Sequence, residues 1–389
     1  MSGIVSSLAS LSTLITKGTT PTTLGYAHAD SGIPFLRVQN IFGGQVNFEE
    51  DTLFIGEDTH SALKRSQIQG GDVLVTIAGT IGRTGVVPLD APSMNCNQAV
   101  AIVRPTAQID RSYLRHWLES QAARSQMIGS TVTGTISNLS LTQLGELKVP
   151  LPPLADQRRI AAILDQAETL RTQRRAALAQ LDSLTQSLFL DMFGDPRTNP
   201  VKWREVTVGA ITDSIVPGRD KPKSFSGGVP WITTANLIHM GATLPRSEGL
   251  GLNQSEIDEV RAKVIPVGSV IISCVGDLGI VSIAGVPMVI NQQLHSFQCG
   301  DELNNVYLMY ALSFQKAFML AKASSTTLPY MNKSVCNSIP VLVPPLALQQ
   351  TFATRIQAIE SLKTTHRTAL TELDALFASL QQRAFAGEL

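Results

Sequence analysis

Two short stretches of the sequence contain residue types that occur in catalytic sites. Glu146-Leu147-Lys148 supplies the carboxylate and the lysine of a nuclease set, but no Asp occurs at a suitable distance upstream. The stretch "GTIGRTG" at 79–85 resembles a glycine-rich phosphate loop, yet it lies between β-rich runs, whereas such a loop leads into a helix. We therefore predict a hairpin turn there. The sequence also has no NPPY-like tetrapeptide and no GxxxxGKS loop, so we predict no catalytic residues.

The cysteines and histidines are not spaced as metal ligands are. Cys96, Cys274, Cys299 and Cys336 form no CxxC pair, and the six histidines show no HxH or HExxH spacing. We predict buried thiols and no metal site. No apolar run reaches about 18 residues, and no basic region precedes the weakly apolar N-terminus, which predicts a cytoplasmic protein that does not enter a membrane.

A second set of polar residues is suited to nucleic acid. Arg side chains recognise guanine, Asn and Gln recognise adenine, and Lys neutralises phosphates. The predicted DNA-binding residues are Arg37, Gln39, Asn40, Lys64, Arg65, Arg83 and Gln98 in the first half of the chain, and Lys221, Lys223, Thr234, Asn236, Lys263 and Lys333 in the second. Taken singly, each of these residues is more often a solvated surface group. Asn40 with Asn236, and Gln98 with Gln292, occur in both halves and could instead cap turns.

The charge of the chain limits how it could hold DNA. Lys and Arg number 31, Asp and Glu also number 31, and neither half has a large excess of basic residues. A protein that covers many phosphates by itself is usually basic. Any nucleic-acid surface should therefore be a local patch, or should be completed by a partner.

The chain repeats itself. "GIPFLRVQNI" at 32–41 matches "GVPWITTANL" at 228–237, and later stretches match at similar offsets, so a unit of about 195 residues occurs twice in 389. The segments that follow these two matching stretches share little beyond Asn40 and Asn236. Similar scaffolds with different loops predict two related but unequal ligands. The length alone also predicts more than one domain.

Each copy changes character partway along. Short β-branched runs with Gly, Pro and Asn between them predict strands and turns, with one helix near 113–127. Gly and Pro are then absent from 154–190, and the apolar residues follow a heptad there and again at 346–385. A helix of this length, about 55 Å at 1.5 Å per residue, has a second apolar stripe to bury. We expect the two helices to bury each other's stripes as an antiparallel coiled coil.

The heptad assignment can be given residue by residue. In the first helix, position a holds Ile160, Ala167, Arg174, Leu181 and Leu188, and position d holds Ile163, Leu170, Ala177 and Leu184. In the second, position a holds Phe352, Ile359, His366, Leu373 and Leu380, and position d holds Leu362, Ala369 and Leu376. Arg174 and His366 correspond across the repeat. They either form a polar layer that fixes the register or extend to solvent.

These patterns predict an α+β protein made of two globular domains in pseudo-two-fold tandem repeat, separated by two long helices. The predicted boundaries are 1–150 and 196–342 for the globular domains, and 151–195 and 343–389 for the helical spacers.

The chain resembles the specificity subunits of type I restriction-modification systems. The motifs that carry the resemblance are "VPLPPLADQRRIAAILDQAETL" from Val149, "FLDMFGDPRTNPVKW" from Phe189, and the closing "QQRAFAGEL". The resemblance covers the whole chain. It implies that the globular domains are target recognition domains, each recognising one half of a bipartite double-stranded DNA site, and that the chain itself is not catalytic. The family's loops vary too much for its base-contacting residues to be transferred to this chain.

The resemblance also implies partners and their cofactors. The helices would dock two modification subunits that bind S-adenosylmethionine and methylate adenine, and a restriction subunit using ATP and Mg²⁺ could join them. No cofactor is then expected on this chain. Two alternatives remain: a specificity subunit for a fused methylase and nuclease chain, and an enzyme whose active site is too degenerate to recognise.

Overall fold

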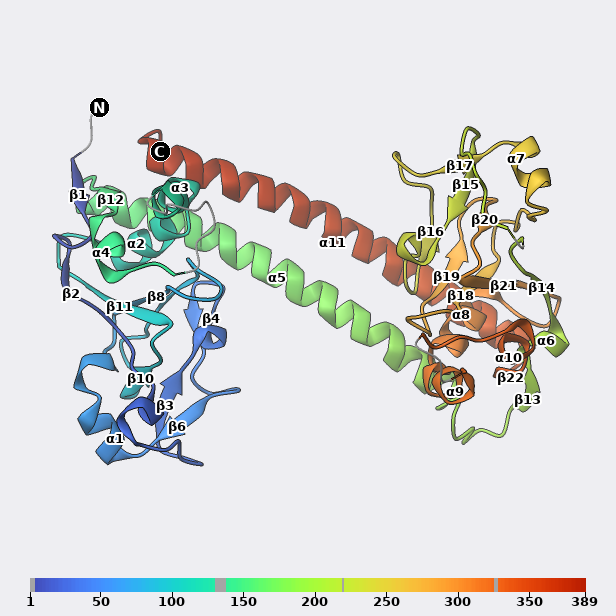
Figure 1. Ribbon diagram of the computed structural model, residues 1–389, viewed down its shortest axis with the longest axis horizontal. Helices are drawn as coiled ribbons and strands as arrows, with labels where there is room; N and C mark the ends of the chain where they lie inside the picture. The colour runs from blue at the N-terminus through green and yellow to red at the C-terminus, as the bar shows by residue number, and fades with distance from the viewer. Residues whose placement is uncertain (1–3, 130–137, 219, 325–327) are drawn as a thin grey trace. The chain divides into compact units, whose positions relative to one another are not determined.

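The computed structural model describes residues 4–129, 138–218, 220–324 and 328–389. The chain divides into two compact units: unit 1 comprises residues 1–176 and 367–389, and unit 2 comprises residues 177–366. Each unit contains one α+β domain together with one end of each long helix (Figure 1). The predicted α+β tandem repeat with two long helices is confirmed.

Unit 1 is built on two four-stranded sheets, ordered β2-β11-β8-β9 and β6-β3-β10-β7, with the small pairs β1-β12 and β4-β5 beside them. Its strands are β1 (Val5–Ser7), β2 (Ser12–Lys17), β3 (Ile33–Leu36), β4 (Ile41–Phe42), β5 (Gln45–Val46), β6 (Leu53–Ile55), β7 (Gln67–Ile68), β8 (Val73–Thr76), β9 (Thr84–Val86), β10 (Met94–Cys96), β11 (Val100–Pro105) and β12 (Lys148–Pro150). Its helices are η1 (Pro21–Leu24), η2 (Val38–Asn40), α1 (Glu57–Ala62), η3 (Lys64–Ser66), α2 (Arg111–Leu118), α3 (Gln121–Gly129), α4 (Leu141–Glu146) and the first part of α5 (Leu154–Phe193).

The alternation of side chains along β8 places one sheet between two cores. Val73 and Val75 join a cluster with α2, α3, α4 and α5, whereas Leu74 joins a cluster with the second sheet. Both faces of the strand are buried because successive side chains of a strand point to opposite sides. The predicted turn at 79–85 connects the antiparallel strands β8 and β9, so it is a hairpin turn. The single helix predicted near 113–127 is two helices, α2 and α3.

Unit 2 repeats this plan with a five-stranded sheet, β14-β21-β18-β19-β16, and a three-stranded sheet, β17-β15-β20, beside the pair β13-β22. Its strands are β13 (Arg204–Thr207), β14 (Thr212–Ile215), β15 (Val229–Ile232), β16 (Ala242–Thr243), β17 (Gly251–Leu252), β18 (Val270–Ser273), β19 (Val281–Ala284), β20 (Val289–Ile290), β21 (Leu294–Cys299) and β22 (Pro340–Val343). Its helices are the last part of α5, α6 (Val208–Ile211), η4 (Thr234–Asn236), α7 (Gln254–Glu259), α8 (Asn305–Ser313), α9 (Lys316–Lys322), α10 (Lys333–Asn337) and the first half of α11 (Leu346–Ala386).

Each long helix begins after a proline pair and is fixed there by one buried glutamine. In unit 1, Gln157 Nε2 donates to the carbonyls of Gln108 (3.1 Å) and Pro152 (2.9 Å), and its Oε1 accepts from the Asp110 N–H (2.8 Å). In unit 2, Gln349 makes the corresponding three hydrogen bonds, at the start of α11. The glutamine of the "PPLxxQ" motif therefore joins the helix to the turn that precedes α2 or α8.

Within each unit the ends of α5 and α11 pack antiparallel. In the first predicted row, Ile160, Ala167, Phe352 and Ile359 are buried, as predicted, and the other six residues are half-buried. Four of the predicted d residues are wrong, since Leu170, Leu184, Leu362 and Leu376 are between 44% and 53% exposed. The other three, Ile163, Ala177 and Ala369, are half-buried. The second row is formed by residues one position later, among which Leu164, Ile356, Lys363 and Ala384 are buried. In a helix of 3.6 residues per turn, neighbours at i+3 and at i+4 share a face, and the apolar pattern alone did not separate them.

The helix pair of each unit carries an ion pair inside this second row. Arg171 Nε lies 2.6 Å from Asp374 Oδ1 in unit 1, and Lys363 Nζ lies 2.8 Å from Asp182 Oδ1 in unit 2. Arg171 and Lys363 lie three positions before Arg174 and His366. Those two residues, for which we gave either a polar layer or extension to solvent, are half-buried.

Candidate nucleic-acid interface

Most of the predicted DNA-binding residues of unit 1 lie along one edge of the sheet β6-β3-β10-β7. β10 is parallel to β3, whereas β6 and β7 run antiparallel to their neighbours. β3 and β10 therefore end at the edge where β6 and β7 begin, and we name it the β3/β10 edge. It carries the segments 37–40, 97–99, 47–52 and 64–66.

At this edge, Arg37 and Gln39 both contact the carboxylate of Asp51, a residue that the sequence did not identify. Arg37 Nη2 donates to the Asp51 carbonyl (3.1 Å) and lies 3.4 Å from Asp51 Oδ1, while Gln39 Nε2 donates to Asp51 Oδ2 (2.5 Å). The pairing of Phe35 with Leu53 brings the end of β3 to the start of β6 and so sets this contact. An arginine and an amide are thereby fixed side by side.

Asn40 of unit 1 and Asn236 of unit 2 each hydrogen-bond to the backbone of their own turn. The Asn40 side chain is buried, and its Oδ1 accepts from the Arg37 N–H at 2.8 Å. Asn236 Oδ1 accepts from the Thr233 N–H at the same distance. Each amide caps the 3₁₀ turn that follows the strand, so of the two interpretations given for this pair the capping one describes the observed contacts.

Gln98 and Gln292 also bind neighbouring loops. Gln98 Oε1 accepts a hydrogen bond from Thr20 Oγ1. Gln292 Nε2 donates to the carbonyls of Gly218 (2.9 Å) and Asp220 (3.0 Å). Gln98 follows β10, an inner strand of its sheet, whereas Gln292 follows β20, an outer strand of its sheet. Each glutamine binds the loop that precedes the parallel neighbouring strand, β3 or β15.

Lys64 and Arg65 are exposed in η3, at the same edge. Their turn is held by the buried Asn95, whose Nδ2 donates to Ser66 Oγ (3.0 Å) and to the Leu63 carbonyl (3.1 Å). Two cations thus lie at the same edge as Arg37 and Gln39, with β10 between β3 and β7, where they could contact phosphates.

Arg83 is not at the β3/β10 edge. It belongs to the turn between β8 and β9, in the other sheet of unit 1. Its guanidinium carbon lies 5.9 Å from the centre of the Phe42 ring, which is 74% exposed at the tip of the β4-β5 hairpin.

Unit 2 has an equivalent edge, which we name the β15/β20 edge. β15 and β20 are parallel and end together, with Trp231 beside Val289. Thr234 Oγ1 lies 3.4 Å from Gln293 Oε1 across this edge. Lys263 is exposed two residues before Ile265, which pairs with Met288 just ahead of β20.

The other lysines predicted in unit 2 are placed less uniformly. Lys221 follows the segment that Gln292 holds at the β15/β20 edge. Lys223 Nζ lies 3.6 Å from Glu259 of α7. Lys333 is away from this edge, because α10 contacts β21 of the five-stranded sheet through Asn337 and His295 (3.1 Å).

Sequence reasoning missed two residues of these edges, Asp51 and Arg246. Asp51 has a left-handed backbone (φ 46°), and its side chain is 78% exposed. Arg246 lies in the loop between β16 and β17, and its Nη2 donates to the Ala235 carbonyl of η4 (3.1 Å). The available signal was the divergence of these loops between the two copies.

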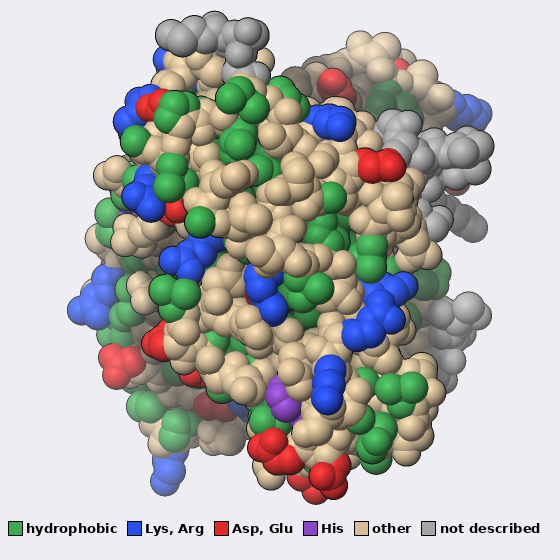
Figure 2. All heavy atoms as spheres, turned by 90° about the vertical axis from the view of Figure 1, so that its left-hand side faces the viewer, with side chains coloured by type: hydrophobic (Ala, Val, Ile, Leu, Met, Phe, Trp, Pro, Cys, Tyr) green, Lys and Arg blue, Asp and Glu red, His purple; other side chains and the backbone are tan. Residues whose placement is uncertain are grey.

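The face of unit 1 that Figure 2 presents has no continuous basic surface. Lys and Arg side chains are scattered among uncharged and hydrophobic ones, and acidic side chains gather near the lower end of the view (Figure 2). A surface of this kind generates little long-range attraction for DNA.

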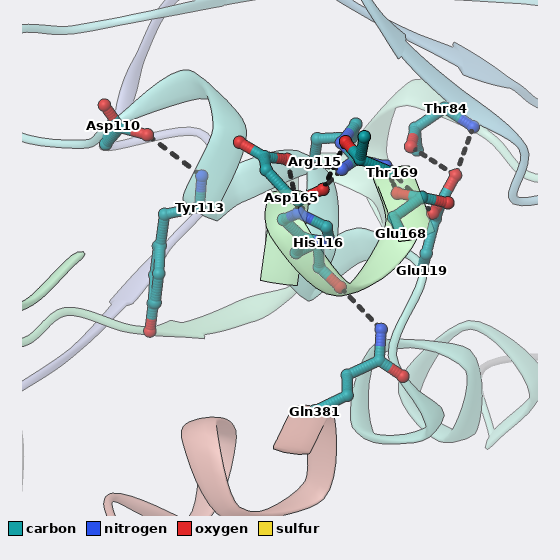
Figure 3. Close-up of polar contacts among 10 residues, drawn as sticks. All are labelled: Thr84, Asp110, Tyr113, Arg115, His116, Glu119, Asp165, Glu168, Thr169 and Gln381. Atoms are coloured by element: carbon teal, nitrogen blue, oxygen red, sulfur yellow. Dashed lines mark hydrogen bonds and ion pairs between the residues drawn. The ribbon is translucent and has the colours of Figure 1, made fainter. Parts of the chain in front are cut away.

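A buried ionic network fixes the sheets of unit 1 to α5 (Figure 3). Arg115 of α2 is 4% exposed, and its guanidinium lies 2.7 Å from Glu168 and 2.9 Å from Asp165. His116 Nε2 lies 2.7 Å from the same oxygen of Asp165. Glu119 connects this network to β9 by accepting from Thr84 Oγ1 at 2.7 Å.

The charges of this network support one another. Burial alone would raise the pKa of Asp165, but the contacts with His116 and Arg115 outweigh it, so the pKa lies below its ordinary value. Burial would likewise lower the pKa of Arg115, but Glu168, Glu119 and Asp165 raise it. Asp165 and Arg115 are therefore both ionised at neutral pH.

In unit 2, aromatic rings rather than ion pairs join the globular domain to the long helices. Phe189 of α5 stacks on Tyr307 of α8 (5.7 Å between centroids) and on Phe314 (5.0 Å), and Phe193 packs against Phe352 of α11 (5.3 Å). One contact is common to both units: Tyr307 donates to the Leu342 carbonyl (2.9 Å), as Tyr113 does to the Pro150 carbonyl (3.0 Å). The repeated scaffold is thus fixed to its helices by different chemistry in each unit.

The remaining predictions concern the Glu146 and Lys148 pair, the cysteines, metal sites and membrane helices. Glu146 ends α4 and Lys148 begins β12. Cys96, Cys274 and Cys336 are buried free thiols, as predicted, and Cys299 is half-buried. Within the described ranges, no group of three His, Cys, Asp or Glu side chains is arranged to hold a metal ion. None of the described helices is both long enough and apolar enough to cross a membrane.

The family comparison follows the repeat. The model of the type I restriction modification DNA specificity domain matches residues 5–180 and again 200–375. The chain belongs to this family.

Relatives within the specificity-domain family match this chain over different lengths and at different identities. The EcoBI specificity subunit of Escherichia coli is 32% identical over 178 residues, which are 44% of this chain and 37% of the relative. The EcoKI specificity subunit of Escherichia coli is 28% identical over 44% of this chain and 39% of the relative. The chain thus aligns with less than half the length of these two relatives. The MjaIX specificity subunit of Methanocaldococcus jannaschii is 21% identical over 88% of this chain and 83% of the relative.

Solved structures share the fold of the specificity-domain family. A chain solved in work on complex assembly and conformational transition of the type I R-M system covers 100% of this chain and 99% of its own length, with a TM-score of 0.60 at 20% identity. The type I S subunit from M. genitalium covers 98% of this chain and 96% of its own length, with a TM-score of 0.60 at 15% identity. At these identities the likeness concerns the fold alone.

Proposed function

We propose that this chain is the DNA sequence-recognition subunit of a type I restriction-modification system, in which unit 1 and unit 2 each recognise one half of a bipartite site. The observation that carries the proposal is the repeated edge. Equivalent sheets end in the same kind of loop cluster, but the side chains there differ: Arg37 and Gln39 in unit 1, Thr234 and Arg246 in unit 2. Equal scaffolds with unequal polar side chains suit two unlike half-sites in duplex DNA.

The long helices support a proposal about partners. Leu170 and Leu376 in unit 1, and Leu184 and Leu362 in unit 2, are about half exposed and correspond across the repeat. Each unit thus presents one exposed leucine from each helix, beside the buried rows. Two equivalent apolar positions favour two copies of one partner, which we propose to be the modification subunit.

The chemistry then belongs to the partners, and the chain itself is not an enzyme. S-adenosylmethionine would bind to the modification subunits, and ATP with Mg²⁺ to a restriction subunit if one joins the complex. These assignments rest on the family and on the absence of a catalytic motif from the sequence.

A reconstitution tests the proposed function. The full chain, a modification subunit and S-adenosylmethionine are incubated with unmethylated genomic DNA, and the methylated sites are mapped. We expect adenine methylation at one bipartite sequence, with none when either protein is omitted. Methylation by the full chain alone would instead favour the enzyme alternative, and activity only with a fused methylase and nuclease chain would favour the other assembly.

A further inference from the structure

The contact between Asp51, Arg37 and Gln39 carries an inference about base recognition, which rests on the proposed function. Arg37 and Gln39 have side chains suited to guanine and adenine edges. Both side chains turn toward the carboxylate of Asp51, which is 14 residues from Arg37 and 12 residues from Gln39 in the sequence. An acidic residue is unexpected at a surface that binds phosphates, so its place there calls for a specific role.

The backbone of Asp51 adopts a conformation that makes the contact possible. Its φ of 46° is left-handed, a region that Asp and Asn tolerate better than other non-glycine residues. The turn directs the Asp51 carbonyl as well as the carboxylate toward η2, since Arg37 Nη2 and Asn40 Nδ2 both donate to that carbonyl, at 3.1 and 3.4 Å. Such local strain is found where a precise geometry matters.

The Asp51 carboxylate does not use up the donors of Arg37. Only Nη2 among the guanidinium nitrogens contacts Asp51, and Nε is buried without an acceptor among the described residues. A guanidinium carries five N–H donors, so it can be oriented by one acceptor and still present a fork to another. Arg37 is 29% exposed, so its conformational freedom is already reduced before any ligand binds.

We propose that Asp51 is a positioning residue for sequence recognition: it holds Arg37 and Gln39 as one preformed pair that recognises adjacent guanine and adenine bases in the half-site of unit 1. Unit 2 achieves rigidity differently, since Arg246 donates to the Ala235 carbonyl and Thr234 contacts Gln293, with no carboxylate on Thr234 among the described residues. The two half-sites should therefore differ at the positions that face these turns.

Electrostatics alone predicts a different outcome for a variant of Asp51, which makes the proposal testable. Removing an acidic side chain from a DNA-binding surface should tighten binding to every sequence alike. A positioning role predicts instead that discrimination falls, because Arg37 and Gln39 lose their fixed orientation. Asp51→Asn suits the test, since Asn tolerates the left-handed backbone and keeps the size of the side chain.

The experiment uses the full chain with its modification subunits and S-adenosylmethionine. The wild-type site is first mapped on unmethylated genomic DNA, and duplexes with each single base change are then methylated by the wild type and by the Asp51→Asn, Arg37→Ala and Gln39→Ala variants. Glu50→Gln is the matched control, because it removes the same charge from the same loop. Thermal melting confirms that each variant is folded.

We expect Asp51→Asn to reduce discrimination on the order of tenfold at one or two adjacent positions of the unit 1 half-site. Those positions should be the ones relaxed by Arg37→Ala and Gln39→Ala, while the other half-site stays intact and Glu50→Gln changes neither. The proposal is overturned if Asp51→Asn keeps full discrimination, or relaxes the same positions as Glu50→Gln. A wild-type complex that methylates no bipartite site would instead refute the proposed function itself.

Discussion

Arg171 of α5 lies 2.6 Å from Asp374 of α11, and the repeat places Lys363 of α11 2.8 Å from Asp182 of α5. The same ion pair thus occurs once in each unit, with the two helices exchanging roles. Arg171 also lies over the Phe377 ring, 4.4 Å from its centre. A charged pair within an apolar row favours one register and the antiparallel direction over alternatives that would leave the charges unpaired.

A double-mutant cycle measures the pair in unit 1. We expect a coupling energy of about 0.5–1 kcal/mol between Arg171→Met and Asp374→Asn, because Asp374 is 43% exposed and water screens the attraction. Urea unfolding of the four proteins gives the value. The control cycle replaces Asp374→Asn by Glu372→Gln on the exposed face, and an equal coupling there would show that the contact has no specific effect.

The glutamine at the start of α11 should be one of the costliest single positions in unit 2. Gln349→Leu removes three hydrogen bonds and leaves the Asn304 N–H and two carbonyls unpaired in a buried place. We expect the free energy of unfolding of unit 2 to fall by about 2–4 kcal/mol. Hydrogen exchange at the Asn304 amide reports the loss locally. Gln350→Leu makes the same replacement at an exposed position and should change little; equal effects of both variants would contradict the assignment.

The acid stability of unit 2 should depend on Glu256. Hydrogen bonds from the Asn253 N–H, and then from Ser224 and Ser226, lower the pKa of Glu256 from 4.5 to about 2. A carboxylate whose pKa is lower in the folded state stabilises the fold fully above its unfolded pKa, and this contribution disappears as the pH falls through the folded pKa. The stability difference between wild type and Glu256→Gln should therefore be largest at neutral pH and shrink from about pH 4.5 downward. Urea unfolding at each pH measures the difference. A stability difference that does not change with pH would contradict this role of Glu256.

The exposed leucines should control how many modification subunits bind. Replacing Leu170 and Leu376 by Asp in unit 1 should leave a complex with one modification subunit, because the equivalent pair in unit 2 is intact. Native mass spectrometry of the assembled complex gives the stoichiometry. Leu89→Asp is the control, since Leu89 is 70% exposed in unit 1 and lies outside the helices. Two bound subunits in the double variant would show that these leucines are not the docking positions.

Much of the fold follows from periodic patterns in the sequence. The tandem repeat, the two long helices and the hairpin turn at 79–85 were predicted because each depends on residues close together along the chain. The second helix row was assigned wrongly, because Leu170 and Arg171 both satisfy a helical spacing and only the packing decides between them. An apolar residue was the natural choice, yet the buried row takes Arg171 and Lys363 with their acidic partners.

The candidate site could be predicted only in part. Arg37 and Gln39 were identified by residue type, and the structure brings them together at one edge. Asp51 was missed because it meets them only through the pairing of β3 with β6, and because its charge is opposite to that expected near DNA. Arg83 and Lys333 have suitable side chains, but the fold places them away from these edges.

The central claim is that each unit recognises its own half of the DNA site. The most direct test exchanges residues 1–150 for the corresponding domain of another family member, with Arg115 and His116 retained so that their contacts with Asp165 and Glu168 persist. The sites methylated by the complex of this chimera are then mapped across a genome. We predict that one half of the bipartite sequence changes and the other half is preserved. A chimera that alters both halves together, in an active and fully assembled complex, would contradict the claim.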